Sequence, residues 1–163
     1  MLQKARFLVG AVLVVLTSAA VSYAVSAAVP DSLRPAGSTR YAVAQSTAAT
    51  SDNSGDAGFE NMADMATSIS IPAGKKGDVM VVYCGETVTG DASTIRVRAM
   101  AGGSLLGPPN VPMDTVTTAG MDCATFYKLN VPDGTRTVRM QWHAYTSATI
   151  WNRTMIVTVN IHD

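Results

Sequence analysis

Apolar and polar residues alternate along much of the chain, and the clearest example runs from Gly134 to Ile161. Every second residue from Val138 to Ala144 is apolar, and the same alternation returns between Met155 and Ile161. A period of two places one side of a strand against a core and the other side in water. The break between the two runs predicts a β-hairpin over this stretch.

Shorter runs of the same kind occur upstream, separated by clusters of Gly, Pro, Asn and Asp. The strands that they predict are 40–45, 65–71, 78–84, 93–101, 111–116 and 122–131. Asp78–Cys84 is almost wholly apolar, which is typical of an inner strand that is buried on both faces. About eight strands with this spacing indicate an all-β protein, an antiparallel β-sandwich. A jelly roll is the topology we expect, and an immunoglobulin-like sandwich is the alternative.

The first thirty residues have a different character. Lys4 and Arg6 precede an uncharged apolar run, Phe7–Tyr23, and small residues follow before Pro30. This order predicts a secretory signal peptide over 1–28. The alternative is an uncleaved signal anchor over 7–29, because 23 residues are enough to span a hydrocarbon core of about 30 Å.

Cleavage would leave a linker, 29–39, and one β-sandwich domain, 40–163. We expect a secreted protein, or a membrane-anchored one with the domain outside if the leader is retained. The chain has 12 basic and 12 acidic residues, and 1–28 contains two basic and no acidic ones, so 10 basic and 12 acidic residues would remain. This balance excludes the clustered basic excess that nucleic-acid binding requires.

The chain has two cysteines, Cys84 and Cys123. In an exported protein, two cysteines on predicted strands most simply form one disulfide. The closed loop would hold 40 residues with both ends counted. The chain-entropy model gives such a bridge about 4 kcal/mol of stabilisation. We expect it to tie the two layers of the sandwich together. Two thiols without a CxxC spacing lack the usual ligand set of a metal site.

A family resemblance rests on Gly134–Trp142, Arg153–Val157, and Ser70-Ile71-Pro72 ahead of Asp78–Val81. This pattern resembles exported bacterial and phage-borne jelly-roll domains, the tumour-necrosis-factor-like group among them. The resemblance implies a non-enzymatic domain that is often trimeric. It carries no functional residue over to this chain.

The longest run without a strand pattern is 46–61, a length typical of a functional loop. Its three carboxylates, Asp52, Asp56 and Glu60, could supply the oxygen ligands that calcium prefers. The spacing of an EF-hand is absent, because Ala57 stands where that loop needs glycine. We therefore expect an ordinary polar loop and no cofactor, with a calcium site as the competing interpretation.

Two aromatic residues near the predicted hairpin connection are candidates for ligand binding. Tyr145 and Trp151 could stack on a sugar ring or fill a pocket of a partner. The competing interpretation of Trp151 is a small cluster that packs under the turn. Trp142 has the inward register and is expected in the core. His143 has the outward register and is expected in solvent.

Cationic side chains could also gather on one sheet face, although a solvated face is the simpler interpretation. They are Arg96, Arg98, Lys128, Arg139 and Arg153. The chain has neither a GxSxG motif nor an acid/base pair at a recognisable spacing, so we expect no enzymatic activity and no catalytic residue. The sequence predicts a secreted protein that binds an extracellular protein or a glycan, or self-associates as a homo-oligomer such as a trimer. The alternative function is a carbohydrate-binding module, with or without calcium.

Overall fold

The computed structural model describes residues 37–52, 58–89, 94–113 and 119–163. All regular structure in these ranges is β-strand. The strands are β1 Thr39–Ser46, β2 Thr50–Asp52, β3 Glu60–Thr89, β4 Ile95–Ala101, β5 Ser104–Leu105, β6 Val111–Pro112, β7 Gly120–Ala144 and β8 Ala148–His162. The predicted leader, with its alternative anchor, lies outside the described residues, as does most of the linker. Within the described ranges, no helix has the length and apolar character needed to cross a membrane.

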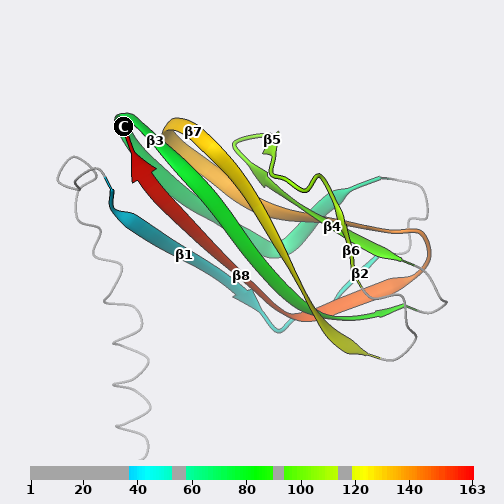
Figure 1. Cartoon of the computed structure of the whole chain (residues 1–163). Coiled ribbons are helices and arrows are strands. Elements are labelled where there is room, and N and C mark those ends of the chain that lie inside the picture. Colours follow the sequence, from blue (N-terminus) through cyan, green and yellow to red (C-terminus); the bar gives the residue numbers. More distant parts are fainter. Residues whose placement is uncertain (1–36, 53–57, 90–93, 114–118) are drawn as a thin grey trace, which may run out of the picture. The chain divides into compact units, whose positions relative to one another are not determined.

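Strands β3 and β7 are long enough to take part in both layers of a sandwich. They pair with each other antiparallel over most of their length, and the register shifts between Ile71 and Lys76. Gly134 lies opposite this shift with φ 104°, a backbone conformation that residues other than glycine rarely adopt. Figure 1 shows the two strands curving over together at this end of the molecule.

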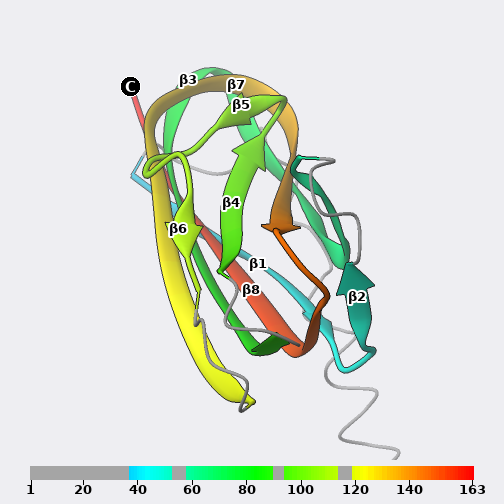
Figure 2. The same cartoon turned by 90° about the vertical axis from the view of Figure 1, so that its right-hand side faces the viewer.

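One layer, called here the β1 layer, contains β1, β8, residues 76–89 of β3 and residues 120–132 of β7. The other, the β4 layer, contains residues 60–71 of β3, residues 134–144 of β7 and β4, with β5 and β6 at its edge. Strand β2 pairs with the start of β8. Figure 2 shows β4 in front of β8 and β1. The predicted all-β antiparallel sandwich of about eight strands is therefore confirmed.

The core between the layers is made by the inward residues of both. Met65, Ile69 and Trp142 come from the β4 layer, and Val81 and Phe126 come from the β1 layer. Each of these side chains is at most 6% exposed. The sequence prediction that Trp142 belongs to the core is confirmed. Pro35–Asp163 forms one compact unit that holds this entire core, as expected of a domain that folds by itself.

The predicted hairpin at 134–161 is wrong. Both arms are strands, but among the described residues no ladder joins β7 to β8. Ala144 pairs with Ile95 of β4, whereas Ala148 pairs with Thr89 of β3. The connection at 145–147 therefore passes from the β4 layer to the β1 layer. A period of two reports which way a side chain points, and it does not report which strand lies alongside.

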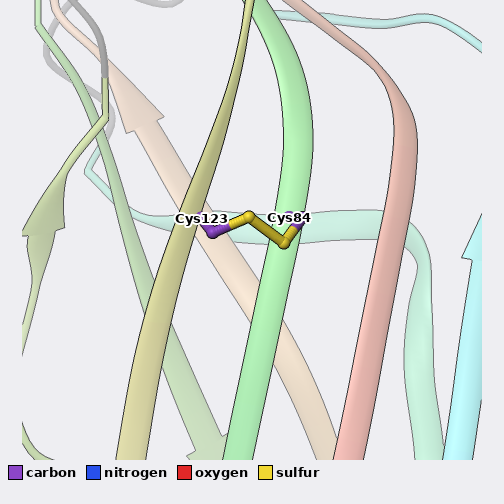
Figure 3. Close-up of a disulfide and its surroundings, with 2 residues drawn as sticks. All are labelled: Cys84 and Cys123. Carbon is purple, nitrogen blue, oxygen red and sulfur yellow. A yellow bond between two sulfur atoms is a disulfide. The ribbon is translucent and has the colours of Figure 1, made fainter.

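The disulfide is present between the two cysteines that the sequence predicts, but it does not join the layers. Cys84 of β3 and Cys123 of β7 are directly paired in the β1 layer, with Cα atoms 4.1 Å apart. Figure 3 shows the bridge between these neighbouring ribbons. Cys84 is half-buried and Cys123 is exposed, so the bridge lies on the outer surface of this layer. The expected tie between the layers is supplied instead by the continuous strands β3 and β7.

Candidate functional site

A ladder of polar side chains crosses the outer surface of the β4 layer. Asn61 of β3 pairs with Gln141 of β7, which in turn pairs with Arg98 of β4. The Nε of Arg98 donates to the Oε1 of Gln141 at 2.7 Å, and the Nε2 of Gln141 donates to the Oδ1 of Asn61 at 2.9 Å. The three planar groups are thus held in a fixed order across the sheet.

Three aromatic rings gather beside this ladder. The His143 ring contacts both Phe59 and Tyr145, with ring centroids 5.8 Å and 4.6 Å away. The guanidinium of Arg98 lies over the Phe59 ring, 4.1 Å from its centroid, at the distance of a cation–π interaction. Tyr145 remains 53% exposed and is the most accessible ring of the three. We call Asn61, Phe59, Arg98, Gln141, His143 and Tyr145 the ladder site.

The expectation that His143 is a solvated strand histidine is wrong. Its side chain points away from the core, as its register requires, but it is only 6% exposed. Phe59 and Tyr145 both contact the ring. Its Nδ1 is buried without a hydrogen-bond partner. Phe59 lies at the end of the loop that the sequence singles out at 46–61, but neither alternation nor spacing predicts that it covers a histidine.

Only some of the predicted cations share this surface. Arg96, Arg98 and Arg139 all point outward from β4 and β7 in the β4 layer. Side-chain hydrogen bonds of Arg96 and Arg98 go to the amide oxygens of Asn110 and Gln141. The ladder site therefore lies in positively charged surroundings whose arginines are not neutralised through these bonds.

Arg153 is not part of any outward face, contrary to the grouping that the sequence suggested. Arg153 has the same inward register as Met155 and Val157 further along β8, and its side chain is 1% exposed. The guanidinium donates to the carbonyl of Ile150 at 2.9 Å and to the hydroxyl of Ser46 at 3.2 Å. Lys128, also placed in that group, occupies a half-buried position on β7 opposite Val79 in the β1 layer.

The two aromatic residues named as ligand contacts lie in different surroundings. Tyr145 belongs to the ladder site, next to His143. Trp151 is half-buried on β8, where it pairs with Glu86 of β3. Among the described residues, no ring contact joins Trp151 to Tyr145. The two therefore do not form one stacking surface, and a binding role of Trp151 stays a separate prediction.

The predicted calcium ligands fall largely outside the described part of the chain. Asp56 lies outside the described residues, and for Asp52 only the backbone position at the end of β2 is described. Glu60 is exposed at the start of β3. Within the described ranges, no three His, Cys, Asp or Glu side chains gather as a metal site would require. The calcium site stays a prediction.

An ion pair fixes the C-terminal end of β8. The Nε2 of His162 lies 3.1 Å from a carboxylate oxygen of Asp78, and its Nδ1 lies 3.0 Å from the Asp163 carbonyl. The bond with Asp163 and then the bond with Asp78 raise the pKa of His162. The backbone N–H of Asn130, with a further contribution from His162, lowers the pKa of Asp78. The pair is remote from the ladder site and stabilises the strand end.

Comparison with known proteins gives no family. No protein-family model matches the chain. No curated protein matches it either. The resemblance to tumour-necrosis-factor-like domains thus has no family-level support.

Three solved structures illustrate the structural similarity. PorU from Porphyromonas gingivalis has a TM-score of 0.44 and 6% identity, with 75% of this chain covered and only 13% of PorU. A CBM36 domain of a xylanase from the hindgut metagenome of Trinervitermes trinervoides has a TM-score of 0.39 and 12% identity, with 72% and 96% covered. A family 35 carbohydrate-binding module from Clostridium thermocellum has a TM-score of 0.38 and 14% identity, with 72% and 97% covered.

Proposed function

We propose that the chain is an exported, non-catalytic module that binds glycans at the ladder site. The observation that carries this proposal is the hydrogen-bonded series Arg98–Gln141–Asn61 beside the exposed ring of Tyr145. A sugar ring offers an apolar C–H face and a rim of hydroxyl groups. An aromatic ring can pack against the C–H face, and planar amide and guanidinium groups can form hydrogen bonds with the hydroxyl groups.

The surrounding charge favours an acidic glycan. Arg96, Arg98 and Arg139 share this surface, and the first two bond amide oxygens in the free protein. A guanidinium binds a carboxylate or sulfate through two parallel hydrogen bonds, which are stronger than bonds to a neutral hydroxyl. We therefore expect uronate-containing or sulfated oligosaccharides to bind more tightly than neutral ones, and the difference to shrink as salt is raised.

The surface is suited to binding rather than to hydrolysis. Glycoside hydrolysis commonly uses a pair of carboxyl groups that face each other across the scissile bond. The ladder site contains amides, an arginine and aromatic rings, and it has no carboxyl group among its described members. The proposal accordingly expects a glycan incubated with the protein to be recovered intact.

The test is a glycan array with residues 35–163, followed by calorimetry with the best neutral and acidic ligands. Tyr145→Ala and Gln141→Ala should each weaken binding at least tenfold, because one removes the stacking ring and the other breaks the ladder. Leu105→Ala, which truncates an exposed apolar side chain on β5 outside the ladder site, is the control and should bind like the wild type. Trp151→Ala tests whether the glycan binds near Trp151 instead of near Tyr145, the two ligand contacts that the sequence suggested. Loss of binding in Trp151→Ala alone, or no binding to any glycan, would refute the assignment.

A further inference from the structure

The outer surface of the β1 layer carries an apolar patch that has no role in the proposed glycan site. Its large side chains are between 40% and 72% exposed: Tyr41, Val43, Met80, Met121, Tyr127, Leu129 and Ile156. Figure 1 shows the four strands that carry them, β1, β8, β3 and β7, side by side. The sequence prediction that Asp78–Cys84 is buried on both faces is wrong, because Met80 is 42% exposed on this surface. A contiguous patch of this kind marks an interaction surface.

The distribution of charge limits what can cover this patch. Among the outward residues of these four strands, the acidic side chains are Asp78 and Glu86, at opposite ends of the β3 segment. Asp78 is paired with His162. Between these ends the surface contains only apolar, hydroxyl, amide and disulfide groups. A second copy of the same surface would therefore meet no like charge at its centre.

The register also places a protruding ring and a groove in one row. Tyr41 on β1, Thr158 on β8, Met80 on β3 and Tyr127 on β7 are successive partners across the sheet. Tyr41, at the β1 edge, is the most exposed large apolar side chain, at 72%. At the other end of the row, Met80, Tyr127, Thr158 and their neighbours line a mostly apolar groove of about 340 Å³.

We propose that two copies of the chain pack face to face through the β1 layer, related by a two-fold axis parallel to the strands. Such an axis between β8 and β3 brings β1 of one copy over β7 of the other. Because the axis is parallel to the strands, residues that are paired across the sheet in one copy face the same row of paired residues in the other. Tyr41 then enters the groove beside Tyr127 of the second copy, and the reverse contact forms at the same time. In the next row, Ile156 lies over Val82 of the second copy.

The size of the surface is compatible with a stable pair. Four strands about 4.8 Å apart and nine residues of about 3.4 Å each span a flat area of roughly 590 Å². Side-chain relief makes the accessible area larger than the flat one, and standard interfaces bury about 800 Å² on each partner. Two antiparallel sheets pack in this way at the core of any β-sandwich, with strand directions about 30° apart.

Sedimentation velocity and light scattering on residues 35–163 test this arrangement through charge complementation. Tyr41→Glu and Tyr127→Lys alone should each raise the dimer dissociation constant at least tenfold, because the first places a carboxylate in a groove that Asp78 also lines and the second buries a charge against the Tyr41 ring. The double variant should regain the dimer, since the introduced lysine of each copy would then face the introduced glutamate of the other. Within one copy these positions are three strands apart, roughly 14 Å, so they cannot pair internally.

Leu105→Lys is the matched control, because Leu105 is exposed on β5 of the β4 layer and should leave the dimer intact. Circular dichroism on each variant separates loss of assembly from loss of folding. A wild type that stays monomeric at millimolar concentration, or that forms a trimer, overturns the proposal. Single variants that still dimerise overturn it, and so does a double variant that fails to regain the dimer.

The disulfide provides a second readout on the same surface. In the proposed pair, Cys84 and Cys123 lie over Thr154 and Gln45 of the second copy. Reduction of the bridge by a water-soluble phosphine should therefore slow at least fivefold as the protein concentration rises through the dimer dissociation constant. The Tyr41→Glu variant should show no such dependence. A rate that is independent of concentration in the wild type contradicts the interface. Because glycan binding uses the opposite layer, either proposal can fail without the other.

Discussion

The disulfide between Cys84 and Cys123 joins two strands that are already neighbours in one layer. It therefore does not hold the sandwich closed, and it acts on the unfolded chain by closing a loop between residues 39 positions apart. In the chain-entropy model such a loop is worth about 4 kcal/mol at most, and native disulfides contribute typically about 2–4 kcal/mol.

Replacing both cysteines with serine should lower the free energy of unfolding by about 2–4 kcal/mol without changing the fold. The β3–β7 ladder continues on both sides of the bridge, so the strands should stay paired. Urea denaturation gives the free energy, and far-UV circular dichroism reports the fold. An unchanged midpoint would show that the bridge adds nothing, and loss of the β spectrum would show that it is needed for the architecture.

Gly85 should not tolerate a methyl group, because Tyr83 packs over it. A Cβ at Gly85 would lie 2.5 Å from the Tyr83 hydroxyl and 3.2 Å from Cγ2 of Ile150. Gly85→Ala should lower the free energy of unfolding by about 1–3 kcal/mol, as overpacking of a core does. Thermal and urea denaturation measure the loss.

Tyr83→Phe supplies the control for that clash. The Tyr83 hydroxyl is buried without a hydrogen-bond partner, so its removal should change stability by less than about 1 kcal/mol. Burial also raises the pKa of this phenol, which keeps it neutral. Combined with Gly85→Ala, the substitution should restore part of the lost stability. A double variant that is no more stable than Gly85→Ala would place the strain at Ile150 instead.

Phe59→Ala should uncover His143 and weaken the ladder site. It removes a ring that covers the imidazole and supports the Arg98 guanidinium. We expect a loss of about 1–2 kcal/mol in the free energy of unfolding, of which the cation–π contact accounts for roughly half. Glycan affinity should fall as well, because Arg98 loses the ring that orients it.

The exposure of His143 in Phe59→Ala can be measured by chemical modification, with His162 as the internal reference. His143 is buried, whereas His162 is half-buried and accessible. Diethyl pyrocarbonate should modify His162 at similar rates in both proteins, and His143 much faster in Phe59→Ala than in the wild type. Equal protection of His143 in both proteins would mean that Tyr145 alone covers the ring.

The Asp78–His162 pair should stabilise the domain within a limited pH window. The pKa of His162 is raised in the folded state, so its contribution is present below the ordinary value of 6.5 and is lost as the pH rises through the folded pKa. The pKa of Asp78 is lowered, so its contribution is present above 3.8 and is lost as the pH falls through the folded pKa. Both contributions coexist between these two ordinary values.

His162→Gln should flatten the thermal midpoint against pH near neutrality, where the wild type loses stability as His162 deprotonates. Scanning the midpoint from pH 4 to pH 9 for both proteins measures the difference. Lys75→Gln, which removes the separate contact with Asp163, is the matched control and should keep the dependence on His162. Identical profiles for His162→Gln and the wild type would show that the pair does not contribute.

Alternation in the sequence predicts the strands and the direction of each side chain, but not what lies above an outward residue. His143 and Met80 both point away from the core, yet His143 is covered by Phe59 and Met80 is exposed. Their exposure differs because a residue at the end of a loop covers His143, whereas nothing in the described part of the chain covers the β1 layer over Met80. Alternation also does not specify which strands pair with each other, so the pairing of both β7 and β8 with β3 could not be predicted.

The ladder site is predictable from the sequence only in part. Tyr145 is a candidate because an aromatic residue near a loop edge can stack on a sugar ring, and Arg98 is one of five grouped cations. Asn61 and Gln141 carry no signal in the sequence, because their role depends on a register set by residues far apart in the chain. The grouping of Arg153 with the outward cations is wrong, and the sequence pattern itself argues against it, because counting back two residues from the inward Met155 places Arg153 on the same buried face.

Because β3 and β7 run through both layers, the two outer surfaces of the domain are fixed back to back on a single bent ribbon. A dimer joined through one surface would display its two copies of the other in opposite directions. Such an object suits bridging between separate polysaccharide strands, and it cannot grip one strand from two sides. If both proposals hold, the bend at Gly134 would set the direction in which a cross-linking dimer presents its two glycan sites.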